Sequence, residues 1–322
     1  MLQEPRLDAF VDETRNMNEL IAAFMAQVPS FATAEGLAQL RADDGVLAGR
    51  AVDEAVVREL PGPAGPIPAR CLTPDTVDAV YLDIHGGGWC IGSARSADAA
   101  NWELAQLAGV AVISIDYRLA PEHPFPAGPD DCEAAALWLL DHAAAEWGTD
   151  RLVIGGSSAG AHLSALTLLR LRDRHGIDVR ARFAGANLLF GAYDLGMTPS
   201  MRNSADALVI PLDTLEACFA NFLPGLDREA RRDPEYSPLY ADLHDLPPAL
   251  FVVGSRDPVH DDSLFMSARW RAAGNATELA VYPESVHGFT TFPTEMASQA
   301  KARMAGWVAQ RLRAAAGAGA RH

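Results

Sequence analysis

The chain has 322 residues, of which 49% are hydrophobic and 21% charged, and a formal net charge of −16 at pH 7. This length and composition suit a soluble protein with a sizeable core, built as one large α/β domain or as two smaller ones. No basic stripe is present to meet phosphates, so the sequence argues against a nucleic-acid partner and against an anionic membrane surface.

The sequence also bears on the compartment. The N-terminus lacks a basic region followed by an apolar core, and no segment is apolar over the roughly 18–20 residues that a membrane span needs. Four cysteines are scattered without a CxxC pair or a histidine at metal-ligand spacing, so we expect free thiols and no bound metal. Together these features predict a cytoplasmic protein. The cysteines are Cys71, Cys90, Cys132 and Cys218.

The first part of the chain has a helical pattern. Residues 5–43 carry apolar side chains at mixed spacings of three and four, which predicts helix. The proline-rich segment 61–69 is unsuited to helix and predicts a turn that leads into an edge strand.

From residue 78 onward, apolar strand-like segments alternate with helical patterns. Strands are predicted at 78–86, 110–117, 151–156, 182–191, 247–255 and 278–284. Helices are predicted at 97–109, 128–147, 159–176, 261–274 and 294–315. This alternation predicts a largely parallel sheet covered by helices on both faces. The segment 192–246 interrupts the alternation and, with the N-terminal helices, is a candidate cap.

Residues 153–162 read VIGGSSAGAH, an apolar run that ends in glycines around two adjacent serines. The pattern G-x-S-x-G fits Ser158 and does not fit Ser157, because Ala159 stands where the second glycine would fall. Glycines at these positions let a strained turn between strand and helix pass close to neighbouring backbone. We therefore expect Ser158 to be a nucleophile, with the free N–H groups of the following helix favouring negative charge beside it.

The motif HGGGWC occupies residues 85–90, at the end of a predicted strand. Three successive glycines cost conformational entropy, so they indicate either a very tight turn or a function. In the functional interpretation, the backbone N–H groups of Gly86, Gly87 and Ala159 form an oxyanion hole. His85 is expected to be structural and not the base.

An acid and a base are expected in two later segments. In GSRDPVHDDS, Asp257 lies just past a predicted strand, where α/β sheets place functional groups. Asp261 and Asp262 begin the next helix, where a carboxylate is expected as a cap or as a partner of the helix dipole. His287 lies in the loop after the last predicted strand. The order Ser158, Asp257, His287 matches nucleophile, acid and base, each after a strand.

Several motifs occur together along the chain: HGGGW, DYRLAPEHPFPA, GSSAGA, SPLYADL, DP at 257–258 and HGF at 287–289. Over residues 65–310 the sequence therefore resembles the bacterial branch of the hormone-sensitive-lipase family of α/β-hydrolase carboxylesterases. The resemblance implies one α/β-hydrolase domain over 1–322, with an eight-stranded, mostly parallel sheet flanked by helices. It also implies a helical cap formed by about 1–45 and 192–235.

Residue roles follow from the same resemblance. It implies the nucleophile Ser158, the acid Asp257, the base His287, and an oxyanion hole of Gly86, Gly87 and Ala159. It implies that DYRLAPEHPFPA supports the oxyanion loop through a buried carboxylate, Glu122, although a proline-stiffened structural loop is an equal interpretation. The chain departs from the family's usual GDSAGG at Ser157, which replaces a carboxylate, and at Ala161. The family often dimerises, so a homodimer is a further expectation.

The substrate pocket is less well defined by the sequence. Trp89, directly after the glycines, is a candidate to border it. Phe24 and Met25 are candidates as well, with cap core as the alternative for both. Because no hydrophobic lipid-binding lid is evident, we expect a small-molecule ester with a short to medium acyl chain, hydrolysed without a metal or organic cofactor.

Two other functions are compatible with these motifs. One is an amidase or lactonase that uses the same three side chains. The other is a non-catalytic binding protein, as in the plant gibberellin receptors, which resemble this family but lack the catalytic histidine. The presence of His287 argues against the second.

Overall fold

A computed structural model describes residues 7–42 and 51–319. Its centre is a sheet of eight strands in the order β1-β2-β4-β3-β5-β6-β7-β8. β1 and β2 are antiparallel, β2 and β4 are antiparallel, and all other neighbours are parallel. The predicted fold class is confirmed. The strands are β1 Val56–Leu60, β2 Ile67–Leu72, β3 Ala79–Ile84, β4 Val110–Ile115, β5 Leu152–Ser157, β6 Phe183–Leu189, β7 Ala249–Gly254 and β8 Thr277–Tyr282.

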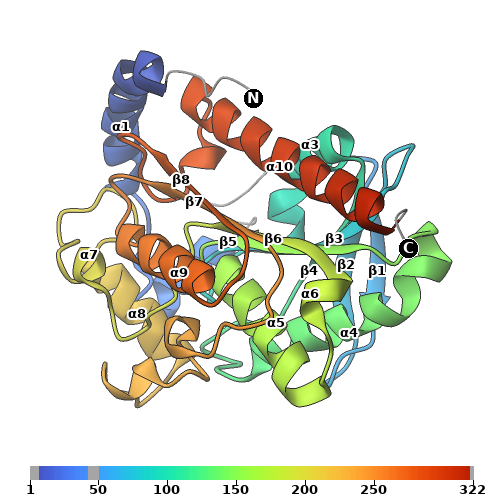
Figure 1. Ribbon diagram of the computed structural model, residues 1–322. Helices are drawn as coiled ribbons and strands as arrows, with labels where there is room; N and C mark the ends of the chain where they lie inside the picture. The colour runs from blue at the N-terminus through green and yellow to red at the C-terminus, as the bar shows by residue number, and fades with distance from the viewer. Residues whose placement is uncertain (1–6, 43–50, 320–322) are drawn as a thin grey trace.

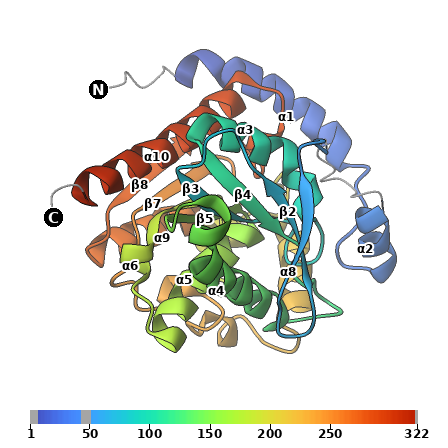
Figure 2. The same ribbon diagram turned by 90° about the vertical axis from the view of Figure 1, so that its right-hand side faces the viewer.

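The central strands are apolar because helices cover both faces of the sheet. Every residue of β3, β4 and β7 is buried, as expected for parallel strands that meet helices on each side. α3 and α10 pack together and cover one face, whereas α4, α5 and α9 cover the other (Figures 1 and 2). These helices are α3 Asp98–Ala108, α4 Ala127–Trp147, α5 Ala159–His175, α9 His260–Ala272 and α10 Glu295–Gly319, and the short α6 Val179–Arg182 precedes β6.

The remaining helices come from the two segments predicted to form a cap. The first supplies η1 Leu7–Phe10, α1 Val11–Met25 and α2 Ala34–Arg41, and the second supplies α7 Pro199–Arg202 and α8 Leu212–Phe222. α7 contacts α8 and α9. α7 and α8 lie at the left of Figure 1. Short 3-10 turns complete the chain: η3 Ala94–Ala97, η4 Ala230–Arg232, η5 Pro238–Tyr240 and η6 Phe289–Thr291.

Two predictions in the first 70 residues were wrong in part. The helix predicted over 5–43 is interrupted between α1 and α2, where Pro29 cannot donate a helical hydrogen bond and Thr33 caps a new helix through Gly36 N. Residues 5, 6 and 43 lie outside the described part. β1 was not predicted, because Val56 and Val57 are 58% and 67% exposed. Consequently the strand after the proline-rich turn, β2, lies inside the sheet instead of at its edge.

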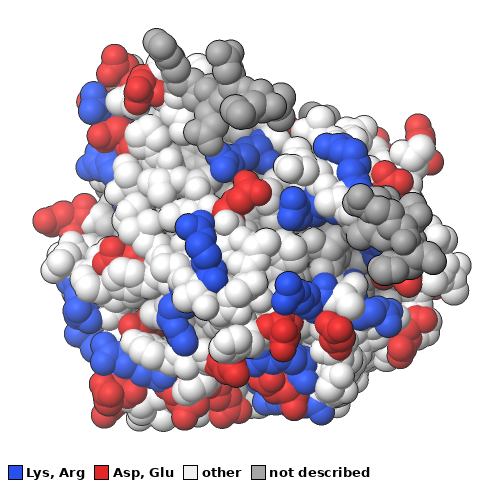
Figure 3. Space-filling model, in the orientation of Figure 1, with Lys and Arg blue, Asp and Glu red and all other residues white. Residues whose placement is uncertain are grey.

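The surface and the cysteines match the composition. On the face in Figure 3, basic and acidic side chains are interspersed. None of the helices within 7–42 and 51–319 is long and apolar enough to cross a membrane. The four cysteines are free and buried, as predicted.

Candidate active site

Ser158 lies at the turn between β5 and α5, in a strained backbone conformation. Its φ is 55° and its ψ −120°, values that a residue with a side chain adopts only where the surroundings impose them. Its N–H donates to the carbonyl of Leu189 at 2.8 Å. A Cβ added to Gly156 or to Gly160 would lie 2.1 or 1.8 Å from the Ile84 carbonyl oxygen. Both glycines of G-x-S-x-G are therefore required by the close approach of β3.

Ser158, His287 and Asp257 form one hydrogen-bonded chain of side chains. His287 Nε2 lies 2.9 Å from Ser158 Oγ, and His287 Nδ1 lies 3.0 Å from both carboxylate oxygens of Asp257. Because the carboxylate can only accept, the Nδ1–H donates to it and leaves Nε2 free to accept from the serine hydroxyl. His287 and Asp257 are 6% and 3% exposed, so little water competes for these bonds. Val259 N also donates to Asp257, at 2.9 Å.

The three side chains converge because each follows the carboxyl end of a parallel strand. Ser158 follows β5, Asp257 follows β7 and His287 follows β8, and such ends meet at one edge of the sheet. Ser158 and His287 are 129 positions apart in the chain. The three residues predicted from the sequence therefore form one compact cluster, although they are far apart in the chain.

The neighbouring aspartates have another role. Asp262 accepts from Tyr193 N at 2.6 Å and from Thr198 Oγ1 at 2.6 Å, and Asp261 accepts from Ser200 N at 2.8 Å. Burial raises the pKa of Asp262 to about 7, partly opposed by these hydrogen bonds. The pair thus connects the start of α9 to the segment after β6. Both aspartates lie in the first turn of α9, where they face the helix dipole as predicted, but the predicted capping role was wrong, because the N-cap residue is Val259 and the two carboxylates accept from the other segment.

The glycine loop lies directly against the turn that carries Ser158. A Cβ added to Gly86 would lie 2.8 Å from the Ser157 carbonyl oxygen and 3.4 Å from Ser158 Cβ. Gly87 has a φ of +119°, and a Cβ there would lie 2.1 Å from the Ile91 carbonyl oxygen. Neither position can hold a larger residue without moving backbone, which accounts for the glycines.

His85 is held away from proton transfer at the serine. Its ring stacks on Tyr117 at 4.3 Å, and its Nδ1–H donates to the Gly86 carbonyl at 2.7 Å. Tyr117 donates its hydroxyl to the His85 carbonyl at 3.0 Å. Burial lowers the pKa of His85, which favours the neutral ring. The imidazole beside Ser158 belongs to His287.

The predicted pocket residues lie in different surroundings. Trp89 is 3% exposed and stacks on Phe222 of α8 at 4.8 Å, in contact with the second cap segment. Phe24 is 51% exposed on the last turn of α1, and Met25 beside it is partly buried. Their role in substrate binding stays a prediction.

Arg41, which the sequence did not single out, joins three groups around the glycine loop. Its Nε donates to the Cys90 carbonyl at 2.7 Å, its Nη2 to the Ala120 carbonyl at 2.7 Å, and its Nη1 to Glu122 at 2.9 Å. The prediction of a buried carboxylate at Glu122 was wrong, since this side chain is 57% exposed. A guanidinium on α2 reaches it from outside, across 81 positions of sequence.

Phe190 is a second residue without a sequence signal. It directly follows β6, has a positive φ of 36° and is 2% exposed. Its ring meets that of His287 edge to face, with centroids 5.0 Å apart. This contact restricts the position of the imidazole.

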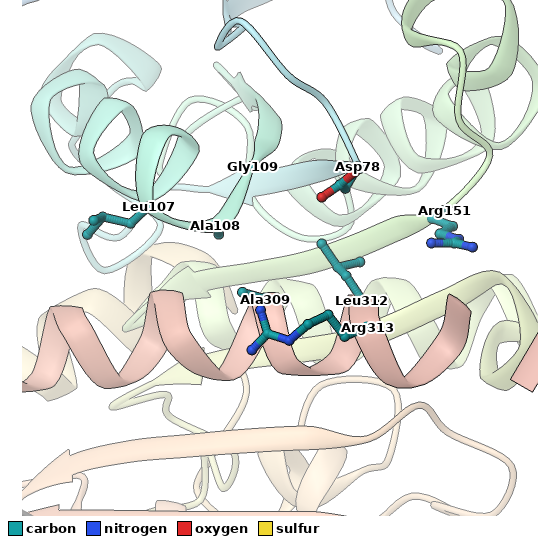
Figure 4. Close-up of a pocket in the computed structure, with 8 residues that line it drawn as sticks. All are labelled: Asp78, Leu107, Ala108, Gly109, Arg151, Ala309, Leu312 and Arg313. Carbon is teal, nitrogen blue, oxygen red and sulfur yellow. The ribbon is translucent and has the colours of Figure 1, made fainter. Parts of the chain in front are cut away.

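No group of three or more His, Cys, Asp or Glu side chains that could hold a metal ion is found in the described parts of the chain. A cavity of about 330 Å³, lined by residues such as Asp78, Arg151 and Leu312, lies between α3 and α10 (Figure 4). Asp78 and Arg151 immediately precede β3 and β5. This cavity is therefore at the amino-terminal edge of the sheet, opposite the edge that carries Ser158.

Known proteins resemble this chain in sequence and in fold. Residues 81–291 match the model of a family described by its alpha/beta hydrolase fold. The carboxylic ester hydrolase LipN of Mycobacterium tuberculosis is 35% identical over 280 residues, covering 79% of this chain and 73% of LipN. An ethyl acetate hydrolase of Pseudomonas putida is 32% identical, with 69% and 71% covered. A solved hormone-sensitive lipase from a metagenome library has a TM-score of 0.80 and 30% identity, covering 93% of this chain and 98% of its own.

The family match covers well over half of the chain, and the sheet order, the strained serine turn and the glycine loop fit the same fold. The chain therefore belongs to the α/β-hydrolase-fold family, in the branch of carboxylesterases related to hormone-sensitive lipase.

Proposed function

We propose that the protein is a serine carboxylesterase that hydrolyses esters with short to medium acyl chains through an acyl-enzyme. The observation that carries the proposal is the chain of hydrogen bonds from Ser158 through His287 to Asp257, at 2.9 and 3.0 Å. The names of the relatives, one of them an ethyl acetate hydrolase, support the reaction class and the short acyl group.

In the proposed acylation step, His287 Nε2 takes the proton from Ser158 Oγ as this oxygen attacks the ester carbonyl carbon. Asp257 accepts from the opposite ring nitrogen, which fixes the tautomer and stabilises the imidazolium that forms. His287 then returns its proton to the departing alcohol as the carbon–oxygen bond of the ester breaks. The product of this step is an ester between the acyl group and Ser158.

The carbonyl oxygen becomes negatively charged in this step. The N–H groups of Gly86, Gly87 and Ala159 are the proposed donors to it, each worth roughly 3 kcal/mol of transition-state stabilisation. The close packing of Gly86 against Ser158 Cβ supports this assignment, because it places the loop within reach of a bound carbonyl. Water activated by His287 then attacks the acyl-enzyme and releases the acid.

The two helical segments are the proposed cap. Phe31, between α1 and α2, and Cys218 of α8 both lie over Gly88: a Cβ added to Gly88 would be 2.6 Å from Cys218 Sγ and 3.9 Å from the Phe31 ring. Asn221 of α8 donates to the Phe31 carbonyl at 3.5 Å and joins the two segments. Such close cover over the glycine loop favours small acyl groups.

A fluorophosphonate probe tests the nucleophile. We expect a covalent adduct on Ser158 in the wild-type protein and in the matched variant Ser157→Ala, and none in Ser158→Ala. An intact, folded wild-type protein that acquires no adduct would contradict the enzyme proposal and favour a binding protein.

A panel of substrates tests the reaction and the acyl length. Turnover of p-nitrophenyl butyrate is expected to exceed that of the laurate by a large factor, and turnover of matched anilides and lactones is expected to be much lower. Equal or rising rates on longer chains would contradict the short-acyl proposal. Preferred cleavage of anilides or lactones would identify an amidase or a lactonase instead.

A further inference from the structure

Trp89, the residue after the three glycines, has a backbone conformation that its own side chain disfavours. Its φ is +61°, in the left-handed region, which costs a residue with a Cβ on the order of 1 kcal/mol or more. The carbonyl of Gly87 receives the N–H groups of Cys90 and Ile91, at 3.0 Å each. Trp89 therefore lies inside the turn that orients the proposed oxyanion donors, and something must hold it there.

The indole of Trp89 is fixed by a hydrogen bond to His162, and this bond determines the tautomer of the histidine. Trp89 Nε1–H donates to Nδ1 of His162 at 3.2 Å, and His162 Nε2 lies 2.7 Å from the Tyr236 carbonyl oxygen. An indole nitrogen only donates and a carbonyl only accepts, so the ring proton of His162 must be on Nε2 and its Nδ1 must be bare. The imidazole is fully buried and neutral.

His162 is also rigidly placed with respect to the nucleophile. It lies in the first turn of α5, and its own N–H donates to the Ser158 carbonyl at 3.2 Å. Its ring meets Trp89 edge to face at 5.2 Å and Phe222 of α8 at 6.0 Å. One residue thus connects the serine turn, through its backbone, with the glycine loop and the segment after β6, through its side chain.

We propose that His162 is a positioning residue for the glycine loop: its bare Nδ1 fixes the Trp89 indole, and the fixed indole holds the turn that presents the N–H groups of Gly86 and Gly87. The catalytic consequence rests on the proposed function, whereas the structural connection does not.

His162→Leu removes the acceptor and leaves a buried indole N–H unpaired. His162→Asn retains an acceptor near the position of Nδ1, and Trp89→Phe removes the donor while keeping a ring against Phe222. His142→Leu is the matched control, because His142 also contacts a tryptophan, stacking on Trp138 at 4.7 Å, but on the exposed side of α4.

The first measurement is independent of activity. In protein labelled with ¹⁵N, the Trp89 indole resonance, assigned by its loss in Trp89→Phe, is expected to be protected from solvent exchange in the wild type, in His162→Asn and in His142→Leu. In His162→Leu it should exchange at least about tenfold faster, and the amide resonances of Gly86 and Gly87 should shift. Unchanged glycine resonances would overturn the proposal.

The second measurement is the division of the effect between kcat and KM for p-nitrophenyl butyrate. Since displacement of oxyanion donors mainly affects the transition state, His162→Leu is expected to lower kcat about 10- to 100-fold with KM within about threefold of wild type. His162→Asn should recover to within about threefold, and Trp89→Phe should lose about three- to tenfold. Because Trp89→Phe removes the indole that His162 fixes, adding His162→Leu to it should cost no more than about twofold.

Three kinetic results would also overturn the proposal: wild-type kcat in Trp89→Phe, a full additional loss in the double variant, or a loss of equal size in His142→Leu. The Trp89→Phe result decides the matter even if His162→Leu fails to fold. A wild-type protein that hydrolyses no ester and takes no label on Ser158 contradicts the proposed function instead, and the glycine resonances then still decide the role of His162.

Discussion

At the scale of single residues, two adjacent serines illustrate how neighbours decide chemistry. The hydroxyl of Ser158 faces His287 at 2.9 Å, whereas that of Ser157 faces the glycine loop, with Oγ 2.9 Å from a Cβ added to Gly86. Ser157 also stands where the resemblance noted in the sequence implies a carboxylate. Its position beside a proposed oxyanion donor makes it a candidate to tune specificity without taking part in proton transfer.

We therefore expect Ser157→Ala to retain kcat for p-nitrophenyl butyrate within about threefold, and Ser158→Ala to lose it by a factor of about 10⁴ or more, as in other enzymes whose nucleophile acts with a histidine. Steady-state kinetics on both variants check this. Comparable losses in the two variants would contradict the assignment of Ser158 alone.

A second residue-scale prediction concerns pH. Burial, with a smaller contribution from Arg170 on the same helix, lowers the pKa of His162 from 6.5 to about 4, partly opposed by the hydrogen bond with the Tyr236 carbonyl. Below about pH 6.5 the unfolded chain binds a proton at this ring that the folded protein does not bind until about pH 4. The unfolded state then holds more protons, so the free energy of unfolding falls as the pH drops through this window.

The variant His162→Asn lacks this titration. Urea denaturation at pH 7 and at pH 4.5 is therefore expected to show that wild type loses about 2–3 kcal/mol more stability between these pH values than the variant does. Other groups titrate equally in both proteins, so only the difference is informative. An identical loss in both would show that the ring is not buried in its neutral form.

At the scale of elements, α2 is attached to the body of the protein by Arg41. Two hydrogen bonds of Arg41 go to the backbone carbonyls of Cys90 and Ala120, at 2.7 Å each. Its ion pair goes to Glu122, which is 57% exposed. Hydrogen bonds from a charged donor contribute about 1.5–3 kcal/mol each, whereas an exposed ion pair contributes about 0–1. We therefore expect the two backbone carbonyls to contribute more than the Glu122 carboxylate to holding α2 against the protein.

Arg41→Ala is thus expected to lower the free energy of unfolding by about 2–4 kcal/mol, and Glu122→Gln by less than about 1 kcal/mol, with the smaller effect suppressed by added salt. Denaturant titrations of both variants at low and high salt provide the test. A Glu122→Gln effect as large as that of Arg41→Ala would show that the ion pair dominates.

Prediction from the sequence succeeded for elements whose environment is uniform. Parallel strands buried on both faces must be apolar throughout, so β3, β4 and β7 were evident, and a parallel sheet then gathers the residues after its strands at one edge. The exposed edge strand β1 carries no such pattern. Arg41 with Cys90 and Trp89 with His162 meet across 49 and 73 positions, and one sequence contains no signal for contacts of that kind.

At the scale of the whole molecule, the sheet and the proposed cap share one apolar core. A continuous cluster of buried side chains runs from Leu37 and Leu40 of α2 and Phe219 of α8 into the strands. Separate domains would each enclose a core of their own. This continuity supports the prediction of a single domain.

We accordingly expect one cooperative unfolding transition. Tryptophan fluorescence and far-ultraviolet circular dichroism followed in urea should give coincident midpoints. Two resolved transitions, the first of them confined to the tryptophan packed against α8, would instead establish a cap that unfolds independently.

The position of His287 after the edge strand β8 has a consequence for the folding of the protein during its synthesis. The strand must join the sheet beside β7, and α1, from the beginning of the chain, then closes over the same loop by donating from Asn18 to the Glu284 carbonyl, across 266 positions. A ribosome has to pass residue 287 before these parts can meet. A premature stop codon before residue 287 therefore yields a chain that lacks the proposed base.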